Sequence, residues 1–411
     1  MRVIFLVVDS LRADALGCYG GPATPTVDHL AAGGARFQTV VSAAPWTVPS
    51  LGAMLTGIGA HRLGLLQWQQ PWPAGVASLF TATRRGRLET ASFVFDPDHL
   101  FRACPEAGVV GSSQDTEAML AWFKARRKND YFAFVHYWWT HVPYLRRKLP
   151  LPDWNRVCKA ILKQLSATDP AERETNRARV KGLYALAVRE WSEVWLPTLL
   201  DAARADVVVV IADHGESWGE RLPAGAALED VFDLHGNHLH DEVLRVPWIV
   251  YAPGLVEPAS IAGLARSVDV TPTLIELLGL EARVVDPRVA GCSLAASLGS
   301  GRIVQAAPAI SARTHDFVDA ETVPTDPGDV YVELASQDLA TKVILDFQGG
   351  DTRAYDLATD PGERAPLAVP STQARKLADG LRVERESAVV APSAPGEFAL
   401  MRRQLEKLGY L

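Results

Sequence analysis

Hydrophobic residues along the chain gather in short runs that do not alternate with polar residues. Such runs are typical of strands that helices cover on both faces. Because helical stretches separate the runs, the pattern predicts a doubly wound α/β sheet, mostly parallel and flanked by helices, with its site at the carboxyl edge. The expected strands are VIFLVVD (3–9), TASFVFD (90–96), YFAFVHY (131–137), DVVVVIAD (206–213) and VPWIVYAP (246–253), and helical stretches are expected at 26–37, 115–128 and 176–206.

Near residue 300 the pattern changes to shorter strands joined by Gly, Asp and Pro turns. We therefore expect a large α/β domain over 1–300 and a small α+β C-terminal domain with an antiparallel sheet over 301–411. The later strands are expected at APAISART (307–314), VYVELAS (330–336), TKVILDF (341–347) and RAYDL (353–357), with a closing helix at EFALMRRQLEKLGYL (397–411).

Composition narrows the classes of partner. The 411 residues are 48% hydrophobic and carry a formal net charge of −7, with acidic and basic residues interspersed. The sequence therefore gives no sign of a basic face that would bind nucleic acid. It also contains no run of about 18 apolar residues that would predict a membrane span. The apolar run at the start of the sequence is too short, and a charged residue follows it too soon, for a signal peptide. Four cysteines without CxxC spacing argue against a disulfide framework, so we expect a reducing, cytoplasmic setting.

The segment APWTVPSLGAMLTG (44–57) places a threonine before an expected short helix. Pro49 suits a first helical position, and Gly57 suits a helix end. Thr47 then stands where outward-pointing N–H groups favour an anion. Its hydroxyl either caps the helix or acts as a nucleophile. This segment alone leaves both alternatives open, and general capping preference favours the first.

Acidic residues stand at the ends of two expected strands. Asp9 ends the first, and the fourth runs into Asp213 and His214. Polar side chains at the carboxyl ends of buried parallel strands face the crevice in which such folds bind ligands. Asp9, Asp213 and His214 form a donor set for a divalent ion. An ionised Thr47 completes it, because coordination stabilises an alkoxide that free threonine does not form at neutral pH. Taken alone, Asp9 fits helix capping better.

Two groups of histidines accompany these strands. HYWWTHVPY begins with His136, near the end of the third expected strand, and places His141 just past it, and LHGNHLHDE contains His235, His238 and His240. A lone histidine is more often structural, and His238 and His240 also fit exposed helix positions. Four of the ten histidines nevertheless fall within 27 residues. This clustering favours at least one imidazole that donates to an anionic oxygen or protonates a leaving group.

Six ordered motifs give the chain a resemblance to the sulfatase branch of the alkaline phosphatase superfamily. VVDSLRADALGCYG resembles its opening strand and metal loop, APWTVPSLGAMLTG its nucleophile motif, and FVHYWWTHVPY its H-Y-x-x-x-H-x-P-Y segment. ADHGESWGE and HLHDEVLRVPWIVYAPG resemble the second metal loop and the strand after it. SVDVTPTLIELLG, GCSLAASL and AYDLATDPGERAPLA are similar to late signatures, and EKLGYL to the ending. The resemblance covers about 1–100, 130–145 and 180–411 and leaves the insert at 146–180 unassigned.

Departures from the sulfatase pattern bear on the chemistry. Sulfatases convert a Cys or Ser to formylglycine and hold it with an Arg, but the corresponding residues here are Thr47 and Leu51. The methyl group of threonine prevents formation of that aldehyde. Ser10 replaces the second metal aspartate, and the lysine expected near GNHLHDE and the Gly-Lys-Trp-His segment are absent. The chain is therefore more similar to the Thr-nucleophile members, which are phosphodiesterases, phosphonate monoester hydrolases and phosphoethanolamine transferases.

The resemblance also implies roles for single residues. His141 and His235 match positions that contact the transferred group or the leaving oxygen. Members with two metals carry an Asp-x-x-x-His segment, but Tyr137 and Trp139 stand where that carboxylate would be. We therefore expect one divalent ion, zinc first, with manganese and calcium as alternatives. The metal ligands implied are Asp9, Thr47, Asp213 and His214.

Together these patterns predict a metal-dependent hydrolase or transferase of phosphate or phosphonate esters. Thr47 attacks phosphorus, and His141 or His235 protonates the leaving oxygen. Two alternatives stay open, a sulfate-ester hydrolase that dispenses with formylglycine and a non-catalytic relative. Tryptophans near the expected site favour either an aromatic part in the small-molecule substrate or simple core packing. They are Trp46, Trp68, Trp72, Trp138 and Trp139.

Overall fold

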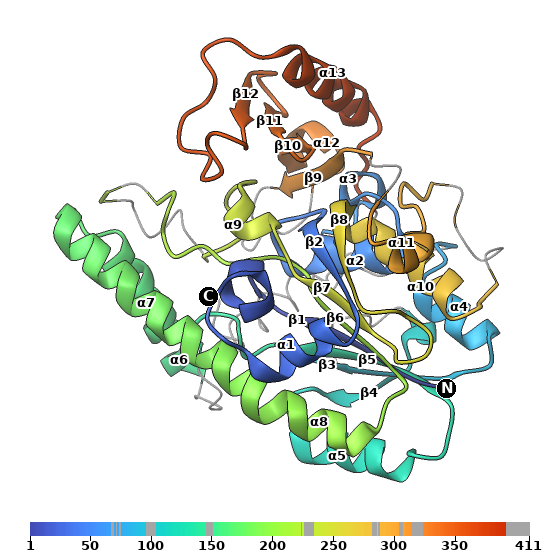
Figure 1. The fold of residues 1–411 in the computed structure, drawn as a ribbon. Coiled ribbons are helices and arrows are strands. Elements are labelled where there is room, and N and C mark those ends of the chain that lie inside the picture. The colour runs from blue at the N-terminus through green and yellow to red at the C-terminus, as the bar shows by residue number, and fades with distance from the viewer. Residues whose placement is uncertain are drawn as a thin grey trace.

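Two β-sheets of unequal size organise the chain, as the computed structural model shows (Figure 1). The structure describes residues 1–411 without 67–69, 71, 74, 96–103, 145–150, 223, 226–233, 282–285, 287, 304–306, 315–323 and 392–411. Trp68 and the closing helix expected at 397–411 therefore lie outside the described residues.

The larger sheet has eight strands in the order β4-β3-β5-β1-β6-β7-β2-β8. Its paired strands run parallel, except that β7 is antiparallel to both β6 and β2. The doubly wound, mostly parallel sheet predicted from the sequence is thus confirmed. The strands are β1 (Arg2–Val8), β2 (Ala35–Val41), β3 (Glu89–Val94), β4 (Val109–Ser112), β5 (Tyr131–Tyr137), β6 (Val207–Ala212), β7 (Trp248–Tyr251) and β8 (Ala259–Arg266).

Helices cover both faces of the larger sheet, which explains why its central strands are apolar throughout. In Figure 1, α7 and α8 run along one face, and α2, α4 and α10 lie on the other. No helix in the described part of the chain combines the length and the apolarity that crossing a membrane requires. The helices of this part are α1 (Pro25–Ala32), α2 (Thr47–Thr56), α3 (Ala60–Leu63), α4 (Leu79–Arg85), α5 (Thr116–Ala125), α6 (Leu151–Leu165), α7 (Pro170–Glu190), α8 (Leu196–Ala203), α9 (Asp241–Leu244), α10 (Val270–Leu277) and α11 (Ala295–Ser300). Short 3₁₀ turns span Ala13–Ala15, Gly17–Tyr19, Pro105–Ala107 and Ser267–Asp269.

The long helical stretch expected at 176–206 is divided in the structure. Helix α7 begins earlier, at Pro170, and passes through a π-helical turn, Trp191–Trp195, into α8. Trp191 and Trp195 are both buried, and both rings contact Tyr137 of β5. A π-turn carries an extra residue within a helix, and the two tryptophans at the ends of this turn face the same strand. The segment 146–180, which matched no motif, supplies α6 and the first half of α7.

The smaller sheet is antiparallel and has the order β12-β11-β10-β9. Its strands match the four short strands expected after residue 300: β9 (Ala309–Thr314), β10 (Tyr331–Gln337), β11 (Thr341–Asp346) and β12 (Thr352–Asp356). Helix α12 (Pro327–Val330) precedes β10. Helix α13 (Thr372–Glu386), which the sequence pattern did not single out, packs on this sheet through residues spaced by three and four positions. They are Ala374, Leu377, Ala378 and Leu381.

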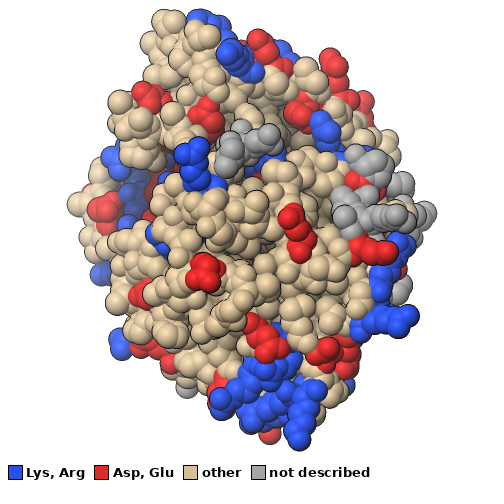
Figure 2. All heavy atoms as spheres, turned by 45° about the vertical axis from the view of Figure 1, so that its right-hand side comes forward, with Lys and Arg blue, Asp and Glu red and all other residues tan. Residues whose placement is uncertain are grey.

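Charged side chains are scattered over the molecular surface. On the face drawn in Figure 2, Lys and Arg lie among Asp and Glu around a largely uncharged area, and several Lys and Arg gather at the lower edge beside acidic residues. This distribution agrees with the interspersed charges of the sequence.

Three adjacent central strands bring the candidate functional residues together. Strand β1 lies between β5 and β6, and the register pairs Val7 with His136 and Val8 with Ala212. Because the three strands run in the same direction, residues at their carboxyl ends meet at one edge of the sheet. Asp9 and Asp213 directly follow β1 and β6 at this edge.

Candidate active site

A compact group of buried polar side chains lies where β1, β5 and β6 end. One donor atom each from Asp9, His136 and Asp213 lies within 4.8 Å of the other two. His136 Nε2 is 3.2 Å from Asp9 Oδ2 and 3.6 Å from Asp213 Oδ2. All three side chains are fully buried, so they face one another rather than water.

Thr47 and His214 complete the group. Thr47 Oγ1 lies 3.2 Å from Asp9 Oδ2 and 3.3 Å from His214 Nε2. His214 Nε2 also lies 3.6 Å from Asp213 Oδ2 and 3.9 Å from Asp9 Oδ1. His214 Nδ1 is 2.8 Å from the carbonyl oxygen of Gly215, which holds the proton on Nδ1 and leaves the Nε2 lone pair facing the group. The four residues expected around a metal ion therefore lie together.

Thr47 is the first residue of α2 rather than the residue before it, and Pro49 is the third. The residue that precedes the helix is Trp46, and no side chain caps this end. The Thr47 hydroxyl contacts Asp9 and His214 instead, so the capping interpretation does not describe it. The first N–H groups of a helix lack intrahelical partners, and they give the Thr47 end of α2 a partial positive charge.

The loop after β1 holds its residues in a strained conformation. Ser10 has a φ of 56°, a left-handed value that costs energy for a residue with a Cβ. Its hydroxyl donates to Asp9 Oδ1 (2.7 Å), and its N–H donates to Asp213 Oδ1 (3.2 Å). The hydroxyl of Tyr184, from α7, donates to the Ser10 carbonyl oxygen and accepts from the Arg12 N–H, both at 2.9 Å. These hydrogen bonds offset the strain and fix both carboxylates.

The electrostatics of the group favour a bound cation. Burial alone would raise the pKa of Asp9, but the hydrogen bond with His136 and the neighbouring imidazoles lower it below its ordinary value. Burial alone would lower the pKa of His136, but the carboxylates of Asp213 and Asp9 raise it to about 9. The two carboxylates therefore create a field that holds a positive charge in a region without solvent.

The donor set fits a divalent metal ion. Asp213 Oδ2 and His136 Nδ1 are buried and have no hydrogen-bond partner among the described residues, and His136 Nε2 has only its close contacts with the two carboxylates. Unsatisfied buried polar atoms of this kind point to a missing ligand such as an ion. Carboxylate oxygens and imidazole nitrogens are donors that zinc and manganese accept. Asp9, His136, Asp213 and His214 are the side chains that would hold the ion.

Sequence reasoning gave His136 no role in metal binding. The structure places it inside β5, as the penultimate residue. The available signal was an ionisable residue within an otherwise apolar central strand, close to the edge where the site was expected.

His141 and His235 lie close to the buried donor group, beside His214. Their ring centroids are 4.7 Å apart, and His235 is 4.3 Å from the His214 ring. The His141 ring stacks on Trp138 at 4.0 Å with an interplanar angle of 14°, and Trp138 stacks in turn on Phe95. Trp138 is thus buried between two rings, which supports the packing interpretation for this tryptophan.

A buried carboxylate orients His235. His235 Nδ1 is 3.1 Å from Glu216 Oε1, and the Tyr144 hydroxyl donates to Glu216 Oε2 at 3.2 Å. Burial lowers the pKa of His235, and the nearby His214 and His141 rings lower it further. The ring is therefore neutral at pH 7 in the free protein.

His238 and His240 are not the exposed helix residues considered from the sequence. His240 directly precedes α9 and is buried, and His238 lies two residues earlier and is mostly buried. Burial, together with nearby cations, lowers the pKa of His238 to about 3, and burial and His238 lower that of His240 to about 2. Both rings are consequently neutral at pH 7, and both lie outside the Asp9–His136–Asp213 group.

The sheet topology, with a buried donor group at its carboxyl edge, is of the kind found in the sulfatase branch of the alkaline phosphatase superfamily. A family model described as Sulfatase matches residues 2–280. The chain belongs to the sulfatase family.

Known proteins resemble the chain in part of its sequence and in most of its fold. The Delta 4,5-hexuronate-2-O-sulfatase of Bacteroides thetaiotaomicron is 27% identical over 181 residues, which are 43% of this chain and 34% of that protein. The matched part thus spans about a third of the length of this relative. A 2-O GAG sulfatase structure superposes with a TM-score of 0.68 at 18% identity over 94% of this chain and 91% of that one. The phosphonate monoester hydrolase of Agrobacterium radiobacter gives 0.67 at 17% identity over 94% and 95%. At these identities, the two structures show a shared fold.

Proposed function

We propose that the protein is a metal-dependent hydrolase or transferase of phosphate or phosphonate esters, with Thr47 as its nucleophile. One observation carries the proposal. Thr47 Oγ1 lies at the start of α2, within 3.3 Å of both Asp9 Oδ2 and His214 Nε2. A hydroxyl in this position lies beside two of the four side chains that would hold the ion.

Threonine favours phosphorus over sulfur as the reacting centre. It cannot become formylglycine, the group with which sulfatases attack, because its Cβ carries a methyl group. Metal-activated hydroxyls are established nucleophiles in phosphoryl transfer. A phosphonate monoester hydrolase shares the fold of this chain, so the architecture is compatible with this chemistry.

The residues of the site supply the steps of a double displacement. When bound, a divalent ion supplies positive charge that lowers the pKa of a hydroxyl and neutralises phosphoryl oxygens. Thr47 gives up its hydroxyl proton to water, the bond from its Oγ1 to phosphorus forms as the bond to the leaving oxygen breaks, and the N–H groups at the start of α2 face the equatorial oxygens. The proton that the leaving oxygen takes up comes from His141, or from His235 once the negative charge of the bound ester has raised its pKa and it has gained a proton. Water or an acceptor alcohol then cleaves the phosphothreonine and restores the hydroxyl.

Sulfate-ester hydrolysis without formylglycine is the second candidate. Membership of the sulfatase family and the similarity to a hexuronate sulfatase favour it. Sulfate and phosphate esters have nearly the same shape, so the same pocket accommodates both.

A substrate panel separates the two candidates. We would measure kcat/KM for an aryl phosphodiester, an aryl phosphonate monoester and an aryl sulfate with the metal-loaded protein. The proposal expects the phosphorus esters to react fastest and their turnover to disappear in Thr47→Ala. A sulfate rate above both phosphorus rates would replace the first candidate by the second. A protein that turns over none of the three would contradict the proposed activity.

A further inference from the structure

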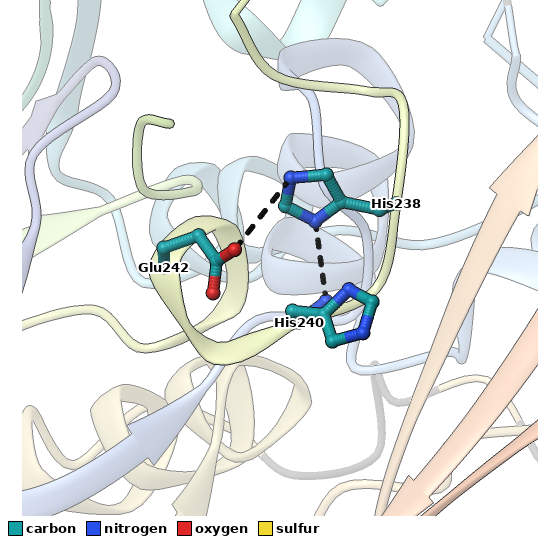
Figure 3. Close-up of side chains that lie close together, drawn as sticks. All are labelled: His238, His240 and Glu242. Carbon is teal, nitrogen blue, oxygen red and sulfur yellow. Dashed lines mark hydrogen bonds and ion pairs between the residues drawn. The ribbon is translucent and has the colours of Figure 1, made fainter. Parts of the chain in front are cut away.

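A second group of donor side chains lies in the loop that precedes α9 and in α9 itself. His238, His240 and Glu242 alternate along the chain and converge in space (Figure 3). One donor atom from each lies within 4.8 Å of the other two, and His238 Nε2 is 3.8 Å from Glu242 Oε1. We propose that these three residues bind a divalent transition-metal ion, with zinc as the best fit, in a site separate from the Asp9–His136–Asp213 group.

Unsatisfied nitrogens are the second observation that points to an ion. His240 is only 6% exposed, and its Nδ1 has no hydrogen-bond partner among the described residues. His238 Nε2 is buried and equally unpartnered there. Buried nitrogens without partners are rare in folded proteins, because a buried polar atom that makes no hydrogen bond costs free energy. A metal ion between the two rings would satisfy this requirement.

The hydrogen bonds around the rings leave lone pairs available. His240 Nε2 is 3.4 Å from the hydroxyl of Tyr355, which suits a proton on Nε2 and a lone pair on Nδ1. A partner that fixes the outer nitrogen in this way is usual for a metal-bound histidine. His238 Nδ1 accepts a hydrogen bond from the His240 N–H, which leaves the ring proton on Nε2. This hydrogen bond is long, 3.4 Å, so little is lost if an ion reorients the ring or moves its proton to Nδ1. Both rings are neutral, the form that binds metals.

Nearby cations are compensated and do not exclude an ion. Arg221 Nε donates to Glu242 Oε1 at 2.7 Å and orients that carboxylate. Lys342 Nζ lies 2.7 Å from Asp241 Oδ1 and 2.6 Å from Glu363 Oε1. Burial raises the pKa of Glu363 to about 7, so at pH 7 the carboxylates of this group roughly balance its two cations.

One of the three proposed ligands borders a cavity. Glu242 lines it together with Arg221 and Asp241, and its volume is about 790 Å³. Two imidazoles and one carboxylate are a donor set that zinc accepts, with water as the fourth ligand.

Zinc stoichiometry tests the proposal without reference to activity. The full chain would be stripped with a chelator, loaded with Zn²⁺, freed of excess and measured by elemental analysis. We expect two zinc ions per chain in the wild type and one in Asp213→Ala, which keeps the second site. His240→Ala and Glu242→Gln should each also retain one. In the Asp213→Ala background, each should weaken the remaining zinc site by about 100-fold or more, because even outer partners of a ligand cost 10–100-fold.

Controls keep the outcome independent of folding and of the proposed catalysis. Glu242→Gln preserves the shape of the side chain and an acceptor for Arg221, and circular dichroism checks each variant. His29→Ala removes an exposed histidine of α1 and should leave the stoichiometry unchanged. Equal zinc content in wild type, His240→Ala and Glu242→Gln would overturn the second site, as would Asp213→Ala that binds no zinc. Failure of the catalytic proposal alone would instead show as an inactive protein that still loses zinc in His240→Ala.

Discussion

At the scale of single residues, the candidate active site depends on what surrounds the Thr47 hydroxyl. The hydroxyl lies between a carboxylate and an imidazole, both fully buried, at the positive end of a helix. Burial makes each electrostatic contact stronger than in water and leaves no solvent to replace a lost partner. Substitutions here should therefore change the chemistry while the surrounding sheet keeps its core.

Replacing Thr47 by Ala should abolish turnover and leave the fold intact. The remaining groups can bind the substrate but cannot form the covalent intermediate, so the rate should fall by several orders of magnitude. Thr47→Ser, which retains the hydroxyl, is the matched control and should keep measurable activity. Steady-state kinetics and thermal unfolding would be compared for the three proteins. Turnover of the Ala variant within tenfold of wild type would exclude Thr47 as the nucleophile.

Asp213→Ala and His214→Ala should each remove the metal ion of the candidate active site, because both side chains are expected to bind it directly. His136→Ala should do the same, since its ring lies within 3.6 Å of both carboxylates. Metal content per chain, measured in the His240→Ala background to remove the second proposed site, reports this loss. Full occupancy in any of the three variants would take that residue out of the ligand set.

The leaving group separates two roles for His141 and His235. If one of them protonates the leaving oxygen, its replacement by Ala should slow an alkyl phosphodiester far more than a nitrophenyl one, because nitrophenolate departs without a proton. If they only bind anionic oxygens, both substrates should suffer alike. Measuring the turnover of both esters by each variant distinguishes the two roles. An equal loss throughout would rule out the acid role.

At the scale of elements, helix α7 supports the loop that carries Asp9. Most of α7 faces solvent, but Tyr184 is fully buried and its hydroxyl bridges Ser10 and Arg12. The bridge satisfies a backbone acceptor and a backbone donor beside a residue with left-handed backbone geometry. A helix that begins in the segment without a motif thus holds the loop after β1 in place.

Tyr184→Phe should destabilise the protein by about 1–3 kcal/mol, because it leaves two backbone groups without their partner. Metal affinity should fall with it, since the loop that positions Asp9 loses its support. Urea unfolding and zinc titration would measure the two effects. Leu186→Ala, at an exposed position of the same helix, is the control and should change stability by no more than about 0.5 kcal/mol. Identical behaviour of the two variants would show that the hydroxyl is dispensable.

At the scale of the whole molecule, polar contacts join α13, which packs on the smaller sheet, to the short helix α3. Glu384 of α13 accepts from Arg62 and contacts His61, two residues of α3, at 2.7–2.8 Å. These hydrogen bonds hold the pKa of Glu384 below its ordinary value, against a smaller opposing effect of burial. The ionised carboxylate therefore stabilises the fold above its unfolded pKa, and this contribution is lost as the pH falls through the folded pKa.

Glu384→Gln tests this pH dependence. At pH 7 the variant should be less stable than wild type by about 1 kcal/mol, because a charge-assisted contact is replaced by a neutral one. The difference should shrink as the pH falls below about 4.5, where the carboxyl group of the unfolded chain gains a proton. Urea unfolding at pH 7 and at pH 4 measures both values. A difference that grows at low pH would contradict the assigned sign.

Much of this architecture follows from the sequence, and the exceptions have physical reasons. The central strands were predictable because unbroken apolar runs fit only a sheet covered on both faces. Asp9, Thr47, Asp213 and His214 were predictable because they follow strands or begin a helix beside an apolar run. His136 was missed because the residues that its side chain faces depend on the register of β5 against β1, which the sequence alone does not give. The burial of His238 and His240 depends on α9 and Tyr355, which are brought together only by the fold.

The π-helical turn between α7 and α8 has a consequence for the angular phase of the helix. Each residue of an α-helix turns the chain by about 100°. One extra residue therefore rotates the side chains before the turn by that angle, about the helix axis, relative to the side chains after it. In the observed phase, Trp195 meets Tyr137 of the sheet while Tyr184 meets the loop after β1. Deleting Val194, an exposed residue of the turn, would restore a regular helix and swing Tyr184 off its target. The turn thus sets the rotation between the two halves of the helix, so that one half contacts the sheet and the other contacts the loop after β1.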